Sequence, residues 1–379
     1  MKVEPHARAA PKARSRRPSA NAVTVRDVAR AAAVSVATVS RALNGNTAVD
    51  EKLRRKVAAA AARLGYTPHA AARALASQRT LTIGAVIPTL ESPNFSIGVE
   101  AMQRRLAEAG YTLLLASSNY DSAEELRQVR ALAARGVDGL LLVGARHEQA
   151  LYELLDARGI PFVNAWTLDG ERPRVGFDNR EVGRMLADYL LDLGHVEFGM
   201  IAQRAEASDR SAARVVGVKE ALERRGLQLP AERIQLIERA HKIAEGQIAL
   251  RTLMHLSRMP TAVICGTDAL AFGAMLEAQR LGIAIPGDLS IAGINDVEFA
   301  AHLNPPLTTV RLPADEIGAR AADYLLGCVT GKPVAPDTQV QVSLIVRGST
   351  APPPRVRSGR EARMTSQSRM TYLCLKESQ

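Results

Sequence analysis

Apolar residues recur at helical spacing in three short segments near the start of the chain. In residues 24–32 (TVRDVARAA) they fall on one face when 3.6 residues make a turn. The residues on that face are Val25, Val28, Ala29 and Ala32. Thr24 is the first residue of the segment and Asp27 follows three positions later, which is the pattern of an N-terminal capping box. These positions predict an amphipathic first helix.

A second helix is predicted to begin after Ser35, which serves as its N-cap, with Val34 packing on Val39 as a hydrophobic staple. A third helix is predicted over residues 50–64, and Gly65 ends it. The inward residues of this third helix are Leu53, Val57, Ala60 and Leu64. Two short helices joined by a tight turn and supported by a third predict a helix-turn-helix domain.

The second helix also has a predicted outward face. The residues on it are Val36, Ala37, Ser40 and Arg41. Small side chains let a helix approach base edges, a valine or alanine methyl can meet a thymine methyl, and Arg41 can bond guanine or phosphate. The alternative is an ordinary solvent-exposed helix face, which the pattern alone does not separate from a DNA-reading face.

From Leu81 onward, apolar runs alternate with amphipathic helical segments, which is typical of βα units on a parallel sheet. The first set of runs is LTIGAVIP, TLLLASS, GLLLVG and IPFVNAW, and the second set is FGMIAQ, TAVICG, LSIAGIN and LTTVRLP. Two such sets predict two lobes. A cleft at the carboxyl ends of their strands would accept a small polar ligand.

Charge is distributed unevenly along the chain. Of 379 residues, 47% are hydrophobic and 23% charged, which is a globular composition with room for two or three domains. The net charge is +10, and residues 1–80 hold 16 basic against 4 acidic residues. A basic segment on an acidic remainder is typical of a module that binds nucleic acid, although residues 1–22 taken alone also fit a disordered basic leader.

Several other classes of protein are disfavoured. The sequence has no run of 18 apolar residues and no apolar segment behind its basic start, so we expect neither a membrane span nor a secretory signal, and we expect a cytoplasmic protein. Cys265, Cys328 and Cys374 are far apart and lack metal-ligand spacing, so reduced thiols and no metal site are expected. The GxSxG, GxGxxG and P-loop motifs of enzymes are also missing, and we expect no cofactor and no enzymatic activity.

Residues 24–77 resemble the headpiece of the LacI/GalR family of bacterial transcription regulators, and similar patches continue almost to residue 350. The resemblance implies an all-α helix-turn-helix headpiece followed by an α/β two-lobed periplasmic-binding-protein-like domain with two parallel-sheet, Rossmann-like lobes. One departure is Ala33, which stands where the family usually has glycine before the second helix. The turn must therefore tolerate a Cβ atom at this position.

Residues 68–79 resemble the family's hinge, a segment that becomes helical on operator DNA. Leu75 matches the leucine that the family inserts into the minor groove, and the alternative is a linker residue that contacts its own domain. His69 stands where the family often has asparagine. With the headpiece, the resemblance gives as candidate DNA contacts Thr24, Val25, Ser35, Val36, Ala37, Thr38, Ser40, Arg41, Asn44, His69, Ala72, Arg73 and Leu75.

The second region, residues 80–350, resembles the family's effector-binding and dimerisation domain. Residues 172–183 would form the first crossing between lobes and residues 293–313 the second. By position, the candidate effector contacts are Asn94, Phe95, Trp166, Arg210, Arg214, His241, Asp268 and Asn295. Structural alternatives stay open for several of them. Arg214 could pair with Asp178 across the lobes. Phe95 and Trp166 could simply pack in the wall of the cleft, and Asp268 could cap a helix.

The cleft is predicted to be cationic. Asn295 and Ala165 stand where many relatives have carboxylates, while the second lobe brings in two arginines together with His241 and Lys242. This balance favours an anionic effector, such as a gluconate-like or ketogluconate-like sugar acid. A neutral sugar or nucleoside is the alternative.

The predicted protein is a homodimeric repressor that reads a near-palindromic operator and is controlled by an effector in its cleft. The alternatives are an activator, a cleft that senses a partner protein, and a sugar-binding protein without a regulatory role. The predicted domains are a basic leader at 1–22, a DNA-binding domain at 23–67, the hinge at 68–79, the effector domain at 80–350 and a disordered tail at 351–379.

Overall fold

The computed structural model describes residues 23–43, 49–67 and 79–354, which belong to two compact units that divide after Thr80. The predicted leader, most of the predicted hinge and most of the predicted tail lie outside the described residues. Those three assignments therefore stay predictions.

The first unit is the predicted helix-turn-helix arrangement. Its helices are α1 (Val25–Ala32), α2 (Val36–Leu43) and α3 (Glu51–Leu64). Val28, Val39 and Val57 are fully buried, one from each helix, and form the centre of a small apolar core. Because these are the positions that the helical periodicity placed inward, the pattern alone accounts for the packing of the three helices.

Side chains at the helix starts satisfy backbone groups that have no partner inside the helix. The Thr24 N–H donates to the Asp27 carboxylate at 2.9 Å, and the Thr24 hydroxyl donates to the same oxygen at 2.7 Å. At the second helix, the Thr38 N–H donates to Ser35 Oγ at 3.1 Å. Both predicted caps are present, and each one fixes where its helix begins.

The turn between α1 and α2 contains a left-handed residue at position 33, where the LacI/GalR family usually has glycine. Ala33 has φ 52° and ψ 48°, and its N–H closes the end of α1 on the carbonyls of Ala29 and Arg30. A left-handed conformation is unfavourable for a residue with a Cβ atom. The turn keeps its geometry, but with alanine it stores strain that glycine would not.

The second unit consists of two α/β lobes. The first lobe has the strand order β11-β5-β4-β3-β1-β2, and the second has the order β12-β10-β9-β8-β6-β7. The strands of the first lobe are β1 (Thr82–Ile87), β2 (Thr112–Ser117), β3 (Gly139–Val143), β4 (Phe162–Ala165), β5 (Arg174–Gly176) and β11 (Asp337–Gln339). Those of the second lobe are β6 (Phe198–Gln203), β7 (Ile234–Ile237), β8 (Ala262–Cys265), β9 (Ser290–Asn295), β10 (Thr308–Arg311) and β12 (Ser343–Ile345).

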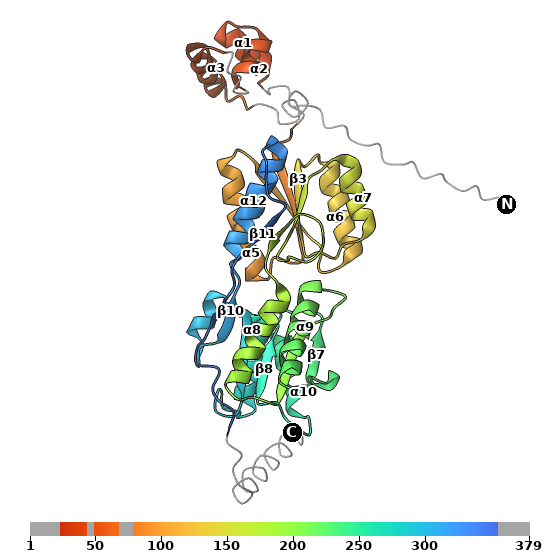
Figure 1. Cartoon of the computed structure of the whole chain (residues 1–379). Helices are drawn as coiled ribbons and strands as arrows, with labels where there is room; N and C mark the ends of the chain where they lie inside the picture. Colours follow the sequence, from red (N-terminus) through yellow and green to blue (C-terminus); the bar gives the residue numbers. More distant parts are fainter. Residues whose placement is uncertain (1–22, 44–48, 68–78, 355–379) are drawn as a thin grey trace, which may run out of the picture. The chain divides into compact units, whose positions relative to one another are not determined.

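Helices cover both faces of each sheet. In the first lobe, α5 (Pro93–Glu108) and α12 (Ala314–Thr330) lie on one side and α6 (Ser122–Ala134) and α7 (Gln149–Arg158) on the other (Figure 1). In the second lobe, α8 (Asn179–Asp192) packs with α9 (Asp209–Arg224), and α10 (Ile243–Met254) packs with α11 (Asp268–Arg280). Two short 3-10 helices, Ala231–Arg233 and Glu298–His302, complete the described elements.

Four strands were not predicted from the sequence, namely β5, β7, β11 and β12. Three of them, β5, β11 and β12, have only three residues, which is too short for a periodic pattern. The fourth, β7, has four residues, and β7, β11 and β12 lie at a sheet edge. The strand β12 also runs antiparallel to β10, so the second sheet is not purely parallel.

Three connections join the lobes, where two were predicted. They run from β5 to α8, from β10 to α12 and from β11 to β12. The first lies within the predicted range of residues 172–183, and the second begins at the end of the predicted range of residues 293–313. The third was missed because it joins two of the short strands.

Candidate functional site

The exposed face of α2 is the candidate DNA-reading surface. Val36, Ala37, Ser40 and Arg41 are all exposed, whereas Val39 on the opposite face is fully buried. Within the described part of the chain, the Arg41 guanidinium makes no hydrogen bond or ion pair. The helix therefore presents small side chains and one uncommitted cation on the side that faces away from its own core.

The other headpiece candidates have structural roles in the unit itself. Thr24 and Ser35 cap helices, the Thr38 hydroxyl lies 2.8 Å from Ser35 Oγ, and Val25 is half-buried against the core. The remaining DNA-contact candidates lie outside the described residues; they are Asn44, His69, Ala72, Arg73 and Leu75.

A pocket lies in the second unit where strand ends of the two lobes meet. The predicted effector contacts that line it are Asn94, Phe95, Trp166, Arg210, Arg214 and Asn295. The lining residues that sequence reasoning missed are Ser92, Tyr120, Gln203, Ser208, Ser211, Ala240, Gly266 and Thr267. Most of these follow the carboxyl end of a strand or begin a helix, so the rule for ligand sites in parallel sheets could have found them.

Arg214 is buried on α9 and, among the residues that the structure describes, bonds only to uncharged oxygens. Its Nε donates to Asn179 Oδ1 at 3.0 Å, and its Nη1 donates to the Gly266 carbonyl at 3.0 Å. Burial, followed by the nearby charge of Arg210, lowers the pKa of Arg214 to about 9, so the guanidinium stays charged at neutral pH. The alternative pairing with Asp178 is wrong, because the Asp178 carboxylate instead caps α8 through the N–H groups of residues 180 and 181.

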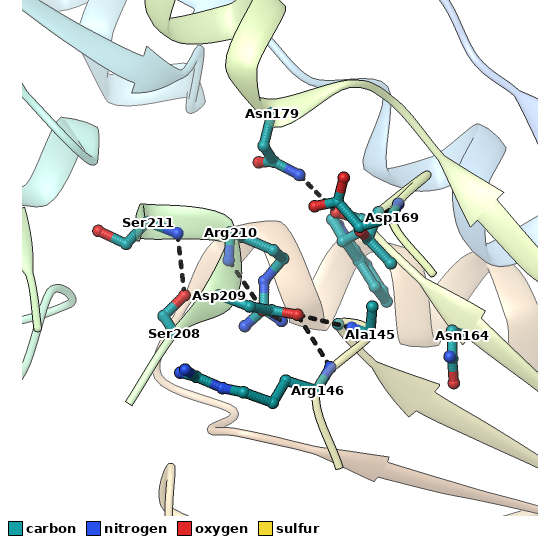
Figure 2. A network of polar contacts seen from close by, with 12 residues as sticks. Ala145, Arg146, Asn164, Asp169, Asn179, Ser208, Asp209, Arg210 and Ser211 are labelled. Atoms are coloured by element: carbon teal, nitrogen blue, oxygen red, sulfur yellow. Dashed lines mark hydrogen bonds and ion pairs between the residues drawn. The ribbon is translucent and has the colours of Figure 1, made fainter. Parts of the chain in front are cut away.

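Asn179 is a functional candidate that sequence reasoning missed. Its Oδ1 accepts the bond from Arg214 Nε, and its Nδ2 donates to the Trp166 carbonyl at 3.0 Å (Figure 2). Trp166 follows β4 of the first lobe, whereas Arg214 belongs to the second. A single buried amide at the start of α8 therefore connects the pocket arginine to the opposite lobe.

Asp209 connects the lobes beside the pocket, behind the lining residue Arg210. Its Oδ2 accepts from the N–H of Ala145 at 2.6 Å and from the N–H of Arg146 at 3.1 Å, both in the loop after β3 (Figure 2). Its Oδ1 lies 3.1 Å from Nη1 of Arg210. The pocket cation at position 210 thus has a carboxylate partner that also holds the two lobes together.

An aromatic pair forms part of the pocket wall. The rings of Phe95 and Trp166 meet edge to face with centroids 5.3 Å apart, and both residues are buried. A Cβ atom at Gly98 would lie 2.6 Å from the Trp166 ring, so the glycine is what allows α5 to approach it. The two aromatic residues line the pocket and also pack on each other. Their positions are therefore compatible with both alternatives considered for them, effector contact and wall packing.

His241 does not line the pocket. Its Nε2 lies 2.9 Å from a Glu91 oxygen, and the ammonium group of Lys242 contacts the same oxygen. Burial, only partly offset by Glu91, lowers the pKa of His241. His241 and Lys242 were predicted to add positive charge to the site, but both contact a carboxylate of the first lobe, which offsets that charge.

Asp268 is fully buried behind the pocket and does not line it. Its Oδ1 accepts from the Thr309 hydroxyl at 2.6 Å and its Oδ2 from the Val297 N–H at 2.9 Å. Burial raises its pKa to about 6. The alternative that Asp268 caps α11 is wrong as well, because the cap is Thr267, whose hydroxyl accepts from the Leu270 N–H at 3.3 Å.

Asn295 and Asp296 occupy unusual backbone conformations at the end of β9, with φ of 132° and 55°. Asn295 lines the pocket, whereas the buried Asp296 carboxylate lies 2.7 Å from Arg311 Nε and 2.6 Å from Arg347 Nη2. The Asp296 carboxylate therefore forms ion pairs within the second lobe and adds no negative charge to the pocket lining.

Both units match known protein families. Residues 24–69 match the model for bacterial regulatory proteins of the lacI family, and residues 187–350 match the model for a periplasmic-binding-protein-like domain. Among the residues that the structure describes, every helix is too short or too polar to span a bilayer.

Relatives cover nearly the whole chain. The HTH-type transcriptional repressor PurR of Escherichia coli O1:K1 is 32% identical over 339 residues, covering 87% of this chain and 98% of PurR. The lac repressor dimer bound to operator and the anti-inducer ONPF is 27% identical with a TM-score of 0.79, over 87% of this chain and 99% of that one.

A third relative is the transcriptional regulator CelR in complex with cellobiose. It is 27% identical with a TM-score of 0.65, over 86% of this chain and 99% of that one. The helix-turn-helix unit, the two-lobed unit and these matches agree with the family that the sequence resembles. The chain belongs to the LacI family of bacterial transcription regulators.

Proposed function

We propose that this regulator represses transcription as a homodimer on a near-palindromic operator and that a sugar acid in the cleft controls its DNA binding. The observation that carries the effector assignment is the charge of the pocket lining, which contains Arg210 and Arg214 and no acidic residue. A ligand carboxylate is the natural partner of a buried guanidinium, because two charge-assisted hydrogen bonds can form side by side. The predicted cytoplasmic location belongs with this proposal, since operator DNA is there.

The effector class is tested by titrating the purified protein with gluconate and glucose, which differ at one carbon of the same chain. We expect gluconate to bind at least about 10-fold more tightly, corresponding to about 1.4 kcal/mol. It should also release operator DNA if it acts as an inducer. Tighter binding of glucose, or no binding by gluconate or ketogluconate, would refute the sugar-acid assignment.

A neutral sugar is the second candidate. The aromatic pair Phe95 and Trp166 could cover the apolar face of a sugar ring, and the related CelR structure contains cellobiose. The same titration separates the two classes. A promoter-reporter comparison with and without the gene separates repression from activation.

DNA reading is assigned to the exposed face of α2, with Arg41 contacting a base. Selection of bound DNA from a random pool would identify the operator. Replacing Arg41 by alanine should then weaken operator binding by about 1–3 kcal/mol and relax the base preference at one position of each half-site. The matched control is Arg63→Ala, which removes an equal charge from an exposed position of α3. Equal losses on all sequences would refute base reading and indicate a phosphate contact.

Dimerisation is assigned to one face of the second unit. Leu115 on β2 and Leu236 on β7 are exposed on the edge strands of the two sheets, and Ile97 and Ile248 are exposed on the helices that contact those strands. We assign these exposed side chains to a common association surface, because contiguous exposed apolar surface marks association sites and the related lac repressor is a dimer. Leu236→Glu should shift the sedimentation of the protein toward the monomer, whereas Val196→Glu, at an exposed site after α8, should not.

A further inference from the structure

The two arginines of the pocket differ in how their charge is balanced. Arg214 donates to the Asn179 amide oxygen and the Gly266 carbonyl, both of them uncharged, and its Nη2 has no hydrogen-bond partner among the described residues. Arg210 lies 3.1 Å from the Asp209 carboxylate, with which it forms an ion pair. The lining of the pocket therefore contains one compensated cation and one uncompensated cation.

The carboxylate of Asp209 is held firmly in place. Besides the Arg210 side chain, it accepts from three backbone N–H groups, those of Arg210 at 2.8 Å, Ala145 at 2.6 Å and Arg146 at 3.1 Å. Burial alone would raise the pKa of Asp209, but the Arg210 charge and the three N–H groups lower it below its usual value. Asp209 is therefore ionised at neutral pH.

The loop after β3 is shaped to admit this ion pair. Gly144 has φ +94°, and a Cβ atom there would lie 2.3 Å from Arg210 Nη1 and 2.8 Å from Asp209 Oδ1. A side chain at position 144 would therefore push Arg210 and Asp209 apart or force the loop after β3 to move away from them. The glycine lets Arg210 and Asp209 stay together against the first lobe, which keeps the charge of Arg210 cancelled.

We propose that Asp209 restricts the effector to a single negative charge, which Arg214 binds. The inference rests on the proposed sugar-acid effector. It adds that the effector carries one negative charge and that this charge binds at Arg214. A second anionic group in this pocket would meet no free cation, and it could gain one only by displacing Asp209 from Arg210 and opening the contact between the lobes. Burying an unpaired charge is costly, so a dicarboxylate or a phosphorylated sugar acid should be rejected.

The direct test compares ligands of equal size on the unmodified protein. Glucarate differs from gluconate only by a carboxylate in place of the terminal CH2OH group. By calorimetric titration, we expect gluconate to bind at least about 10-fold more tightly than glucarate, and glucose to bind more weakly than gluconate. Glucarate binding as tightly as gluconate would overturn the inference and leave the sugar-acid proposal standing. Binding of glucose in preference to both acids would overturn the sugar-acid proposal and the inference with it.

A variant tests the role of Asp209 itself. Asp209→Asn keeps the shape of the side chain but removes the charge that cancels Arg210. We expect the ratio of glucarate to gluconate affinity to rise by about 10-fold, because Arg210 then becomes available to the second carboxylate. An unchanged ratio in a variant that retains operator binding would show that Asp209 does not set the charge number.

The matched control is Glu91→Gln. Glu91 also connects the lobes, through His241 and Lys242, and its loss removes the same charge without touching Arg210. The ratio of glucarate to gluconate affinity should stay at the wild-type value in this variant. A rise equal to that of Asp209→Asn would attribute the selectivity to net charge or to lobe closure in general, and would overturn the specific role of Asp209. If the Asp209 variant loses operator binding and does not fold, the titration of the unmodified protein still decides the matter.

Discussion

Substituting Gly217 with alanine tests how closely α8 and α9 must pack for the pocket to form. The two helices contact each other through a glycine from each side. A Cβ atom at Gly217 would lie 2.0 Å from the Arg180 carbonyl oxygen, and one at Gly183 would lie 2.2 Å from the Arg214 carbonyl oxygen. The contact is therefore backbone on backbone, with no flexible side chain that could move aside.

The size of the effect follows from these distances. An ordinary contact of a Cβ atom begins near 3.4 Å, so the helices would have to separate locally by about 1.4 Å. Arg214 lies one turn before Gly217, and its bond to Asn179 is already 3.0 Å long. A shift of that size would break this bond. Overpacking of this kind costs about 1–3 kcal/mol of folding stability.

Urea unfolding measures the stability loss, and calorimetric titration of the effector measures the damage to the pocket. The matched control is Gly287→Ala, where the nearest heavy atom to the new Cβ is the Ala284 Cβ at an ordinary 3.5 Å. If Gly217→Ala destabilises the protein no more than the control and leaves effector affinity intact, then the glycine contact does not position Arg214 and the reasoning is refuted.

Three further predictions concern other parts of the chain. Ala33→Gly should stabilise the first unit by about 0.5–1 kcal/mol, because relief of the left-handed alanine exceeds the added flexibility of the unfolded chain; slower amide hydrogen exchange in α1–α3 would confirm it, and faster exchange would contradict it. Hydrogen bonds from Arg280 and, more weakly, from Arg251 outweigh the effect of burial and lower the pKa of the buried Glu277 to about 2. The ionised carboxylate therefore contributes its full share of folding stability above pH 4.5, and this share declines as the pH falls toward 2. Since both arginines are about half exposed, Glu277→Gln should cost about 1–2 kcal/mol at pH 7 and less at pH 3.5 by urea unfolding, and an equal cost at both pH values would argue against the pairing. Asp296→Ala should cost about 3 kcal/mol by the same measurement, because it leaves two arginine side chains without their buried carboxylate, and a loss below about 1 kcal/mol would contradict this.

Local patterns were sufficient for the headpiece. The spacing of apolar residues placed Val28, Val39 and Val57 inward, and the capping residues fixed the starts of α1 and α2. Each of these signals acts within one helical turn of its own position. Longer apolar runs located eight strands of the two lobes in the same way, whereas β5, β11 and β12, with three residues each, gave no periodic signal and were missed together with the edge strand β7.

Candidate pocket residues were located by resemblance and by strand ends, and six of the eight line the pocket in the structure. The partners of charged groups were beyond the reach of the sequence. Asp178 was considered as the partner of Arg214, but Arg214 bonds to the neighbouring Asn179 and to the Gly266 carbonyl. Asp268 was considered as a cap, but its carboxylate joins two segments about 30 and 40 residues further along the chain.

The sequence by itself determined the order of elements, the two faces of α2, the division into a basic headpiece and a two-lobed domain, and the family. These properties depend on residues that are close together along the chain. Tertiary structure decided the surroundings of the two pocket cations. Asp209, the sequence neighbour of Arg210, is held by the N–H groups of the distant loop after β3, while Arg214 meets the uncharged oxygens of the distant Asn179 and Gly266. The physical reason is that burial and hydrogen bonding between distant segments set the charge of a site, and no periodic pattern records which distant groups will meet.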